Sequence, residues 1–349
     1  MSWINEKGPA KDVVLSSRTR LARNVAKYPF PVILPEKQAR EIAEKVRKSI
    51  RDGKTDLNSD FLFFFTKDVP AVERQILVEK HLASPDLMKN PGISALALDS
   101  SEKVTVMVNE EDHIRMQCIL PGFQMNQAWE TLNHVDDVIE GEVDYAFDKD
   151  LGYLTSCPTN VGTGLRASVM LHLPALTANN QMNAILQAIS KIRLTARGIY
   201  GEGTEALGNI YQISNQITLG SSEEDIINNL NVACRQIVEN ERMARKAFLK
   251  VNGIQFKDAI WRSFGILCHA RVLELKEFMA LISQVRMGIS MGILPNINTE
   301  VVDTLMTEGQ PAGVRKKAGR KLDEMEVNIV RADLIRKAMK DIISSETNS

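Results

Sequence analysis

The chain has 349 residues, of which 43 are basic and 44 acidic, giving a formal net charge of −1. This length allows a substantial core and predicts two domains or one large one. The balanced charge argues against direct nucleic-acid binding, which normally requires a basic excess. The four cysteines, at positions 118, 157, 234 and 268, form no CxxC pair, so we expect neither a structural zinc site nor a disulfide framework.

The first residues, MSWINEKGPAKDV, contain no apolar signal core, and no apolar run of 18 residues occurs anywhere in the sequence. Scattered thiols are typical of a reducing compartment. We therefore expect a cytoplasmic protein that does not associate with membranes.

The first 250 residues alternate between helix-like and strand-like segments. Helices are predicted over residues 36–50, 125–139 and 179–194, and strands over residues 61–65, 104–108, 166–173 and 209–217. Glycines at 198, 201, 203 and 208 predict a loop between the last of these helices and the last strand.

The pattern changes at Ser222, which with Glu224 and Asp225 predicts a capped start to a long helix. Residues 257–290 are predicted to be almost wholly helical, residues 309–319 to form a basic turn, and residues 323–343 to form a final helix. A domain boundary is expected near Val251-Asn252-Gly253, dividing the chain into residues 1–252 and 253–349.

Arginines occur at several predicted strand ends and loops: Arg18, Arg20, Arg115, Arg166 and Arg197. Arg18 and Arg20 are two residues apart on an extended segment, so their side chains point the same way. Converging guanidinium groups suit a polyphosphate because each binds oxygens bidentately and stays charged. Taken one at a time, each arginine is more simply explained as a solvated surface charge.

Carboxylates also fall at segment ends. Glu110-Glu111-Asp112 directly follows an apolar strand, and Glu202 lies in a glycine-rich loop that could close over a ligand. Such acidic runs are more often solvated turns or helix caps. Cys157 opens the loop CPTNVGTG, where a buried inert cysteine is a serious alternative to a functional thiol.

Several familiar nucleotide-binding motifs do not match. The GTG of the Cys157 loop has no GK[ST] ending and precedes a strand, unlike a P-loop. The sequence also contains no G-x-G-x-x-G fingerprint and no HRD and DFG set of the protein-kinase fold. If the chain is a kinase, it has another architecture.

Four segments together resemble the phosphagen (guanidino) kinases. They are SSRTRLARN at 16–24, NEEDHIR at 109–115, CPTNVGTGLRASV at 157–169 and RGIYGEGTEALG at 197–208. They follow one another in the family's order and at similar spacing, and the resemblance covers roughly residues 12–250. The long block around CPTN and RASV is highly specific.

Within this family the chain is most similar to the bacterial protein-arginine kinases. Phosphagen kinases carry a helical domain before the catalytic one, whereas here SSRTR begins at residue 16 and the extra helical region follows residue 252. The resemblance implies an α+β fold, with a catalytic domain built on an antiparallel sheet flanked by helices. It also implies an all-helical C-terminal domain that dimerises and binds phosphoarginine.

The resemblance also assigns roles to individual residues. Glu111 and Glu202 match carboxylates that orient the substrate guanidinium, Glu111 also taking its proton, and Cys157 matches the family's reactive cysteine. ATP-contacting positions match Ser17, Arg18, Thr19, Arg20, Leu21, His81, Arg115, Arg166, Ala167, Ser168, Val169, Met170, Arg197, Gly198, Ile199, Tyr200 and Gly201. No protein metal site is expected, because Mg²⁺ would be held mainly through the phosphates of ATP and water.

Two positions depart from the family's pattern. Met170 stands where the phosphagen kinases have a histidine, so packing against adenine is expected to differ. The protein-arginine kinases have an R-D-x-x-R-A motif for phosphoarginine, and here Val327 and Asn328 replace the R-D pair while Arg331 and Ala332 are kept. This puts phosphoarginine control in doubt but not catalysis.

The resemblance implies an ATP-dependent kinase that phosphorylates arginine side chains of proteins in stress-response regulation and marks them for Clp-type proteolysis. Implied partners are proteins with exposed arginines, an activating zinc-binding adaptor, a stress-gene repressor, a Clp protease and a second copy of the chain. Two alternatives stay open: a kinase of a free guanidino metabolite, and a non-catalytic adaptor with a vestigial kinase fold.

Overall fold

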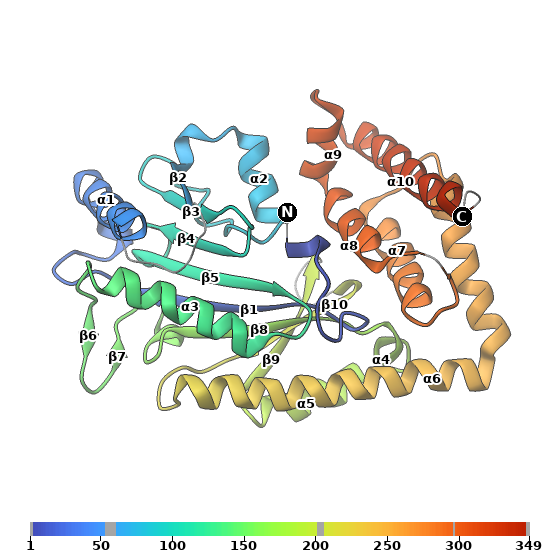
Figure 1. Cartoon of the computed structure of the whole chain (residues 1–349), viewed down its shortest axis with the longest axis horizontal. Helices are drawn as coiled ribbons and strands as arrows, with labels where there is room; N and C mark the ends of the chain where they lie inside the picture. Colours follow the sequence, from blue (N-terminus) through green and yellow to red (C-terminus); the bar gives the residue numbers. More distant parts are fainter. Residues whose placement is uncertain (1–2, 53–60, 201–205, 296, 347–349) are drawn as a thin grey trace.

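The computed structural model describes residues 3–52, 61–200, 206–295 and 297–346, and its centre is an eight-stranded sheet (Figure 1). The strand order is β2-β3-β4-β5-β1-β8-β10-β9, and every neighbouring pair is antiparallel. The strands are β1 (Val14–Arg23), β2 (Phe61–Phe65), β3 (Ala95–Asp99), β4 (Val104–Val108), β5 (Ile114–Pro121), β8 (Leu165–His172), β9 (Leu194–Tyr200) and β10 (Ala206–Asn215). A separate hairpin pairs β6 (Phe147–Asp148) with β7 (Gly152–Tyr153).

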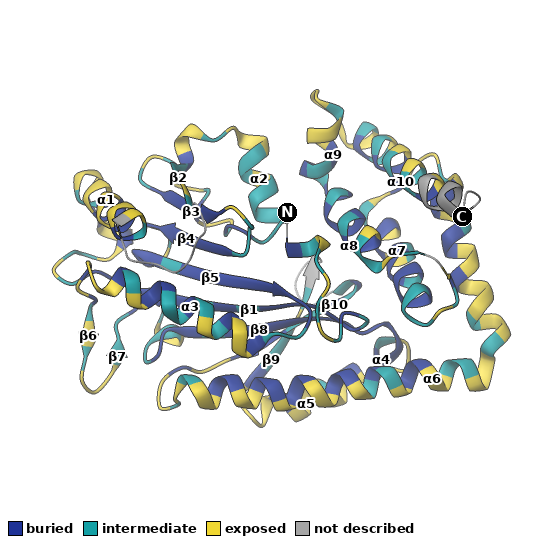
Figure 2. Cartoon of the chain, viewed as in Figure 1, coloured by how far each residue is buried: buried dark blue, intermediate teal, exposed yellow. Residues whose placement is uncertain are grey.

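Helices flank the sheet, so the expected α+β architecture is confirmed. In the N-terminal part they are α1 (Glu36–Asp52), α2 (Ala71–Glu79), α3 (Met125–Glu140), α4 (Pro174–Ala178) and α5 (Met182–Ser190). Helix α3 turns its apolar side to the sheet, and its outer side is exposed (Figure 2). The Thr19 hydroxyl of β1 donates a buried hydrogen bond to the Ala128 carbonyl of α3, at 2.9 Å, which fixes the helix over the central strand.

The C-terminal region is helical, as expected. It continues from the long α6 (Glu223–His269) through α7 (Leu275–Ser290), α8 (Thr299–Glu308), α9 (Pro311–Ala318) and α10 (Glu324–Glu346). Helix α6 begins where the Ser222 hydroxyl accepts a hydrogen bond from the Asp225 N–H group, as predicted. Asn252 has non-helical backbone angles, φ −134° and ψ 43°, and bends α6 at the expected boundary. The division into residues 1–252 and 253–349 stays a prediction.

Several local predictions were wrong. Residues 179–194 are not one helix but contain α5 and the start of β9, and the predicted glycine loop is partly strand, with Gly198 opposite Tyr211. Residues 311–318 form α9 instead of a turn, because Pro311 suits the first helical turn and Gly319, at φ +66°, ends the helix. By contrast, residues 257–290 are almost wholly helical, as predicted, with one interruption between His269 and Leu275.

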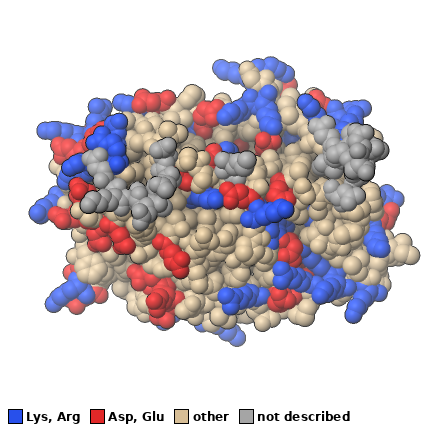
Figure 3. Space-filling model, viewed as in Figure 1, with Lys and Arg blue, Asp and Glu red and all other residues tan. Residues whose placement is uncertain are grey.

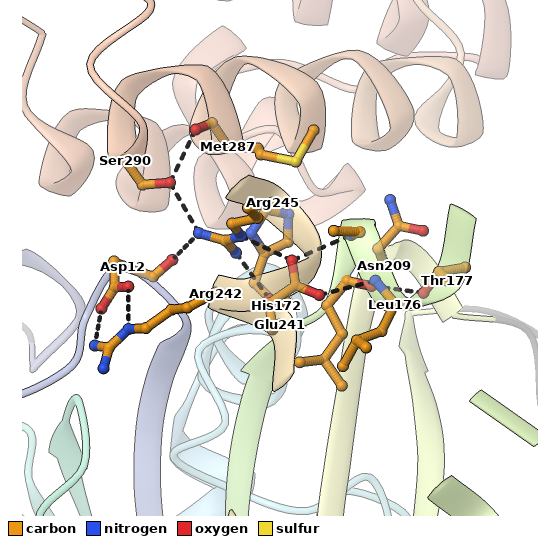
Figure 4. Close-up of polar contacts among 12 residues, drawn as sticks. Asp12, His172, Leu176, Thr177, Asn209, Glu241, Arg242, Arg245, Met287 and Ser290 are labelled. Carbon is orange, nitrogen blue, oxygen red and sulfur yellow. Dashed lines mark hydrogen bonds and ion pairs between the residues drawn. The ribbon is translucent and has the colours of Figure 1, made fainter. Parts of the chain in front are cut away.

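A buried polar network joins the sheet to the C-terminal helices (Figure 4). Arg245 of α6 donates to the carbonyls of Asp12 and His172 and to the Ser290 hydroxyl, and it pairs with Glu241 at 2.7 Å. Apolar residues of β1, β8 and β10 also enter the core of the C-terminal helices: Leu15, Met170 and Ile210. The C-terminal helices therefore pack directly on the strands in the middle of the sheet.

Candidate functional site

The five arginines singled out in the sequence lie on strands β5, β1, β8 and β9 and on the same face of the sheet. Arg20 of β1 is directly opposite Arg166 of β8, and Arg115 of β5 is opposite Ala22. Arg197 of β9 is opposite Gln212, which is itself opposite Met170. Directly opposed residues in antiparallel strands share a face, and residues two apart on a strand do so as well.

This cluster concentrates positive charge that other side chains do not neutralise fully. Burial, followed by the charges of Arg18, Arg115 and Arg166, holds the pKa of the Arg20 guanidinium well below its ordinary value. The pKa of Arg166 is lowered by burial and then by Arg197 and Arg115. The Nε atoms of Arg20 and Arg166 are buried without a hydrogen-bond partner. Buried donors of this kind call for an anionic ligand, so the cluster fits a polyphosphate.

A cavity of about 430 Å³ opens beside these arginines. Its lining combines Arg18, Arg20, Arg115 and Gln117 from the sheet with the end of α2 and the segment that follows it. That volume is within the usual range for small-molecule sites. A cavity of about 570 Å³ between α5 and α6 is larger, but none of its described lining residues is charged. The cavity beside the arginines is therefore the better nucleotide site.

His81 lines this cavity, and its role at an ATP site stays a prediction. It lies directly after α2 with φ +60°, and its carbonyl accepts a 2.6 Å hydrogen bond from the Gln117 amide. Burial, then Arg18 and Arg20, lower the pKa of its imidazole to about 3. The ring is therefore neutral at physiological pH and adds no charge to the arginine cluster.

Glu110 and Glu111 have different surroundings in the turn between β4 and β5. The Glu110 side chain is fully buried and accepts two hydrogen bonds from Arg115 Nη1, at 2.7 and 2.6 Å. Burial acts to lower the pKa of Arg115, but Glu110, Glu111 and Asp112 outweigh it and the pKa is raised. Glu111 is exposed to solvent overall, but part of its side chain is buried. This partial burial, and then the negative charge of Asp112, raise the pKa of its carboxyl above 4.5. A raised pKa suits a carboxylate that accepts a proton.

The turn that carries Glu111 is joined to the loop that carries Cys157. The buried Asp112 carboxylate accepts hydrogen bonds from the Asn24 amide, at 2.7 Å, and from the Ser156 backbone N–H, at 2.6 Å. Cys157 is half-buried, with its Sγ 3.0 Å from Thr159 Oγ1. A negative charge on Cys157 would raise the pKa of Arg166, so Cys157 lies within electrostatic range of the arginine cluster.

Several other residues assigned to ATP contacts can offer only their backbone atoms to the sheet face that carries the arginines. The side chains of Ser17, Thr19, Leu21, Ala167 and Val169 are buried on the opposite face. Ser168 lies on the arginine face, with its hydroxyl 3.4 Å from the Arg18 carbonyl. Met170 is also on that face, but it is only 6% exposed and packs in the core of the C-terminal helices.

The assigned residues of the closing loop are only partly described. Gly198, Ile199 and Tyr200 are at the end of β9, and Gly201 and Glu202 lie outside the described residues. Sequence reasoning missed Gln212, whose Oε1 accepts a 2.7 Å hydrogen bond from Arg18, and Gln117. Both lie opposite assigned residues across a strand pair, and the sequence gives no sign of that register.

In the described part of the chain, no group of three or more His, Cys, Asp or Glu side chains could hold a metal ion. The arginine cluster fits the phosphates of ATP, and Mg²⁺ would then be held through those phosphates and water. None of the helices that the structure describes is both long and apolar enough to cross a membrane.

Residues 41–244 match the family profile described as "ATP:guanido phosphotransferase, C-terminal catalytic domain". The chain belongs to the ATP:guanido phosphotransferase family. Residues 253–349 match a second profile, "Protein-arginine kinase McsB C-terminal domain". A Caldanaerobacter subterraneus protein named protein-arginine kinase is 50% identical over 93% of this chain and 96% of its own length. The protein-arginine kinase of Bacillus subtilis is 46% identical over 97% and 93%.

Solved structures agree on the fold. A lombricine kinase aligns with a TM-score of 0.58 at 24% identity, over 68% of each chain. The duplicated taurocyamine kinase of Schistosoma mansoni aligns with a TM-score of 0.59 at 23% identity, over 74% of this chain and 39% of that one. At this identity the likeness supports the phosphagen-kinase fold alone.

The family profile for the C-terminal region includes the two positions that depart from the phosphoarginine motif. Val327 is only 4% exposed and packs in a small apolar cluster, and Asn328 Oδ1 accepts a 2.6 Å hydrogen bond from Arg331. The buried Arg331 also donates to the carbonyls of Gly309 and Leu273. Arg331 therefore ties α10 to the α8–α9 junction, and Asn328 supplies one of its acceptors.

Proposed function

We propose that the protein is an ATP-dependent protein-arginine kinase. The observation that carries this proposal is the placement of five arginines on one sheet face, with two buried Nε donors unpartnered, beside the exposed carboxylate of Glu111. The arginines suit the phosphates of the donor, and the carboxylate suits a cationic acceptor. The names of the curated relatives supply the acceptor class, a protein arginine.

The proposed reaction transfers the terminal phosphoryl group of ATP to a guanidinium nitrogen. A nitrogen–phosphorus bond forms, the bond between the terminal phosphorus and the bridging oxygen breaks, and ADP leaves. A charged guanidinium, with a pKa above ~12, is a poor nucleophile until it loses a proton. Glu111 accepts that proton, and Glu202 is proposed to hold the guanidinium from a second edge.

The arginine cluster stabilises the negative charge that spreads over the transferring phosphoryl group. Mg²⁺ bound to the phosphates would neutralise further charge there. Glu110 fixes Arg115 through its two hydrogen bonds, so this arginine is held in place before the nucleotide binds. Such pre-organisation lowers the cost of reaching the transition state.

The proposal also covers the cellular compartment, the oligomeric state and the partner proteins. We place the protein in the cytoplasm, and all four cysteines are free thiols, which suits a reducing compartment. We propose a homodimer, supported by exposed apolar side chains on α6: Val251, Ile254 and Trp261. A zinc-binding activator, a stress-gene repressor as substrate and a Clp protease that takes up the phosphorylated proteins complete the proposal by family resemblance.

The test is mass spectrometry for phosphoarginine after incubation with ATP, carried out without acid, with an unfolded basic protein and free arginine as parallel acceptors. Phosphate on the protein's arginines supports the proposal. Phosphate on free arginine alone would support a kinase of a guanidino metabolite. Phosphate on neither, with ATP binding retained, would support a non-catalytic adaptor.

A further inference from the structure

A groove of about 430 Å³ lies next to the Cys157 loop, outside the nucleotide cavity. We call it the hairpin groove. It is formed by the β6–β7 hairpin, by Gly162 and Thr163 at the end of the Cys157 loop, and by residues 218–225 at the start of α6. The reaction proposed above uses none of these residues.

Backbone packing fixes the walls of the hairpin groove. The Tyr153 N–H donates to the Gly162 carbonyl at 2.8 Å. A Cβ atom on Gly152 would lie 2.5 Å from the Gly162 carbonyl oxygen, and one on Gly162 would lie 2.7 Å from the Thr218 carbonyl oxygen. These distances are too short for any side chain, so the three segments touch through their backbones. The groove is therefore pre-formed.

The lining of the hairpin groove is acidic and partly apolar. Asp150, Glu223 and Asp225 contribute carboxylates, and no lysine or arginine is among the described lining residues. Glu223 and Asp225 also stabilise the first turn of α6, but Asp150 comes from the hairpin and has no such role. Lys149, its exposed neighbour, does not line the groove. Figure 3 shows acidic side chains grouped over α3, toward the β6–β7 hairpin.

Three large apolar side chains of the same groove are exposed to solvent. Phe147 is 60% exposed, Leu151 47% and Leu219 46%. Isolated exposed apolar residues are ordinary, but three in one acidic groove can bury area against a partner. The partner that matches both features is a segment with basic and apolar side chains.

The hairpin groove is continuous with the acceptor side of the site. The Thr218 hydroxyl lies 3.0 Å from the Thr159 carbonyl and 2.6 Å from the Val161 carbonyl, both in the Cys157 loop. The same loop is bound at its start to Asp112, the neighbour of Glu111, through the Ser156 N–H. Hydrogen bonds of the Cys157 loop thus connect the groove wall at Thr218 to the turn that carries Glu111, the proposed proton acceptor.

We propose that the hairpin groove binds an extended segment of the protein substrate, flanking the acceptor arginine and carrying lysine or arginine with at least one large apolar side chain. This inference rests on the proposed function and names its substrate class. Chain segments of this composition are exposed in unfolded proteins. Free arginine cannot occupy the acceptor site and the groove together, so it gains nothing from the groove.

The test uses two peptides with one arginine each, flanked in the first by lysine and leucine and in the second by serine. The groove variant is Asp150→Asn with Glu223→Gln. The matched control is Asp258→Asn with Glu324→Gln, which removes two exposed carboxylates from C-terminal helices. For the first peptide, the groove variant should raise KM about five- to tenfold, with kcat and the KM for ATP unchanged. Leu219→Ser should act in the same direction, and added salt should reduce the effect of the charge variant but not that of Leu219→Ser.

Equal changes in KM for both peptides, or a groove variant no different from its control, would overturn the proposal. So would dissociation of a dimer by the groove variant in sedimentation, since the groove would then be an interface between copies. Direct binding of labelled first peptide by fluorescence anisotropy separates the two proposals. Groove-dependent binding without phosphorylation would support the docking surface while refuting the kinase function.

Discussion

Replacing Glu241 by alanine tests the buried network that joins the sheet to the C-terminal helices (Figure 4). Its carboxylate is completely buried, pairs with Arg245 Nε at 2.7 Å, and accepts the N–H groups of Ala175 and Leu176 at 3.1 and 2.9 Å. Removing one partner of a buried ion pair costs about 3–5 kcal/mol, because the other charge stays buried without compensation. The two unpaired N–H groups add about 1 kcal/mol or more.

The same helix provides a matched control. Glu239 also pairs with an arginine, Arg242, at 2.8 Å, but its side chain is 61% exposed. Glu239→Ala should therefore change the free energy of unfolding by no more than about 1 kcal/mol. Glu241→Gln keeps the size and one acceptor oxygen, so it should fall between the two alanine variants and remain measurable if Glu241→Ala does not fold.

Urea unfolding followed by tryptophan fluorescence and circular dichroism measures these differences. With a slope near 3 kcal/mol per M, a loss of about 4 kcal/mol lowers the unfolding midpoint by about 1 M or more. A Glu241→Ala midpoint no lower than that of Glu239→Ala would refute the reasoning. It would mean that Arg245 finds other compensation when its carboxylate is removed.

Three further predictions concern the catalytic site. Glu111→Gln should leave ATP affinity, measured by calorimetry, nearly unchanged. It should lower kcat, measured by phosphoarginine formation, about 10²- to 10⁴-fold. Equal losses of ATP affinity and of kcat would contradict its proposed role as proton acceptor. The pKa of Glu111 is raised, and the proposed proton acceptor is its ionised form, so kcat should fall as pH drops through a value above 4.5. A pH–rate profile without this acidic fall in kcat would contradict Glu111 as the proton acceptor. Arg20→Met should weaken ATP binding about 10- to 100-fold in calorimetry. It should also raise the midpoint of thermal unfolding of the nucleotide-free protein, because it removes a cation placed among Arg18, Arg115 and Arg166. A lower midpoint would show that the like charges do not destabilise the free site.

Sequence reasoning predicted those elements whose signals are local. Alternating apolar residues at Val104, Val106 and Val108 identified β4, and the cap at Ser222 identified the start of α6. The arginine cluster followed from family resemblance, since no single arginine indicated a partner. Convergence of the five arginines on one face depends on the register of β5, β1, β8, β10 and β9.

What the sequence could not predict depends on contacts between distant segments. Gln212 reaches Arg18 across 194 residues, and nothing local distinguishes this glutamine from a surface one. Met170 occupies a family nucleotide position, but its burial depends on helices that begin far along the chain. The glycines at 198 and 208 were predicted to lie in a loop, but both are in strands. They lie where the pairing between β9 and β10 is irregular.

The relation between the two regions of the chain follows from these same contacts. The buried Arg286 of α7 donates to the Lys11 and Asp12 carbonyls, directly before β1, and its Nη1 lies 3.2 Å from His172 at the end of β8. Strands β1 and β8 carry Arg18, Arg20 and Arg166, so α7 holds one end of two strands of the arginine cluster.

A second attachment acts on the other side of the cavity beside the arginines. Glu79, which lines that cavity, accepts the N–H groups of Ala312 and Gly313 at the start of α9, at 2.9 and 3.1 Å. A chain ending at residue 252 would lose both attachments and would expose Leu15, Met170 and Ile210. The bend at Asn252 lies between the regions that the two family profiles match, but the arginine cluster and its cavity are supported from both sides of it. The C-terminal helices are therefore part of the structure that positions the arginine cluster.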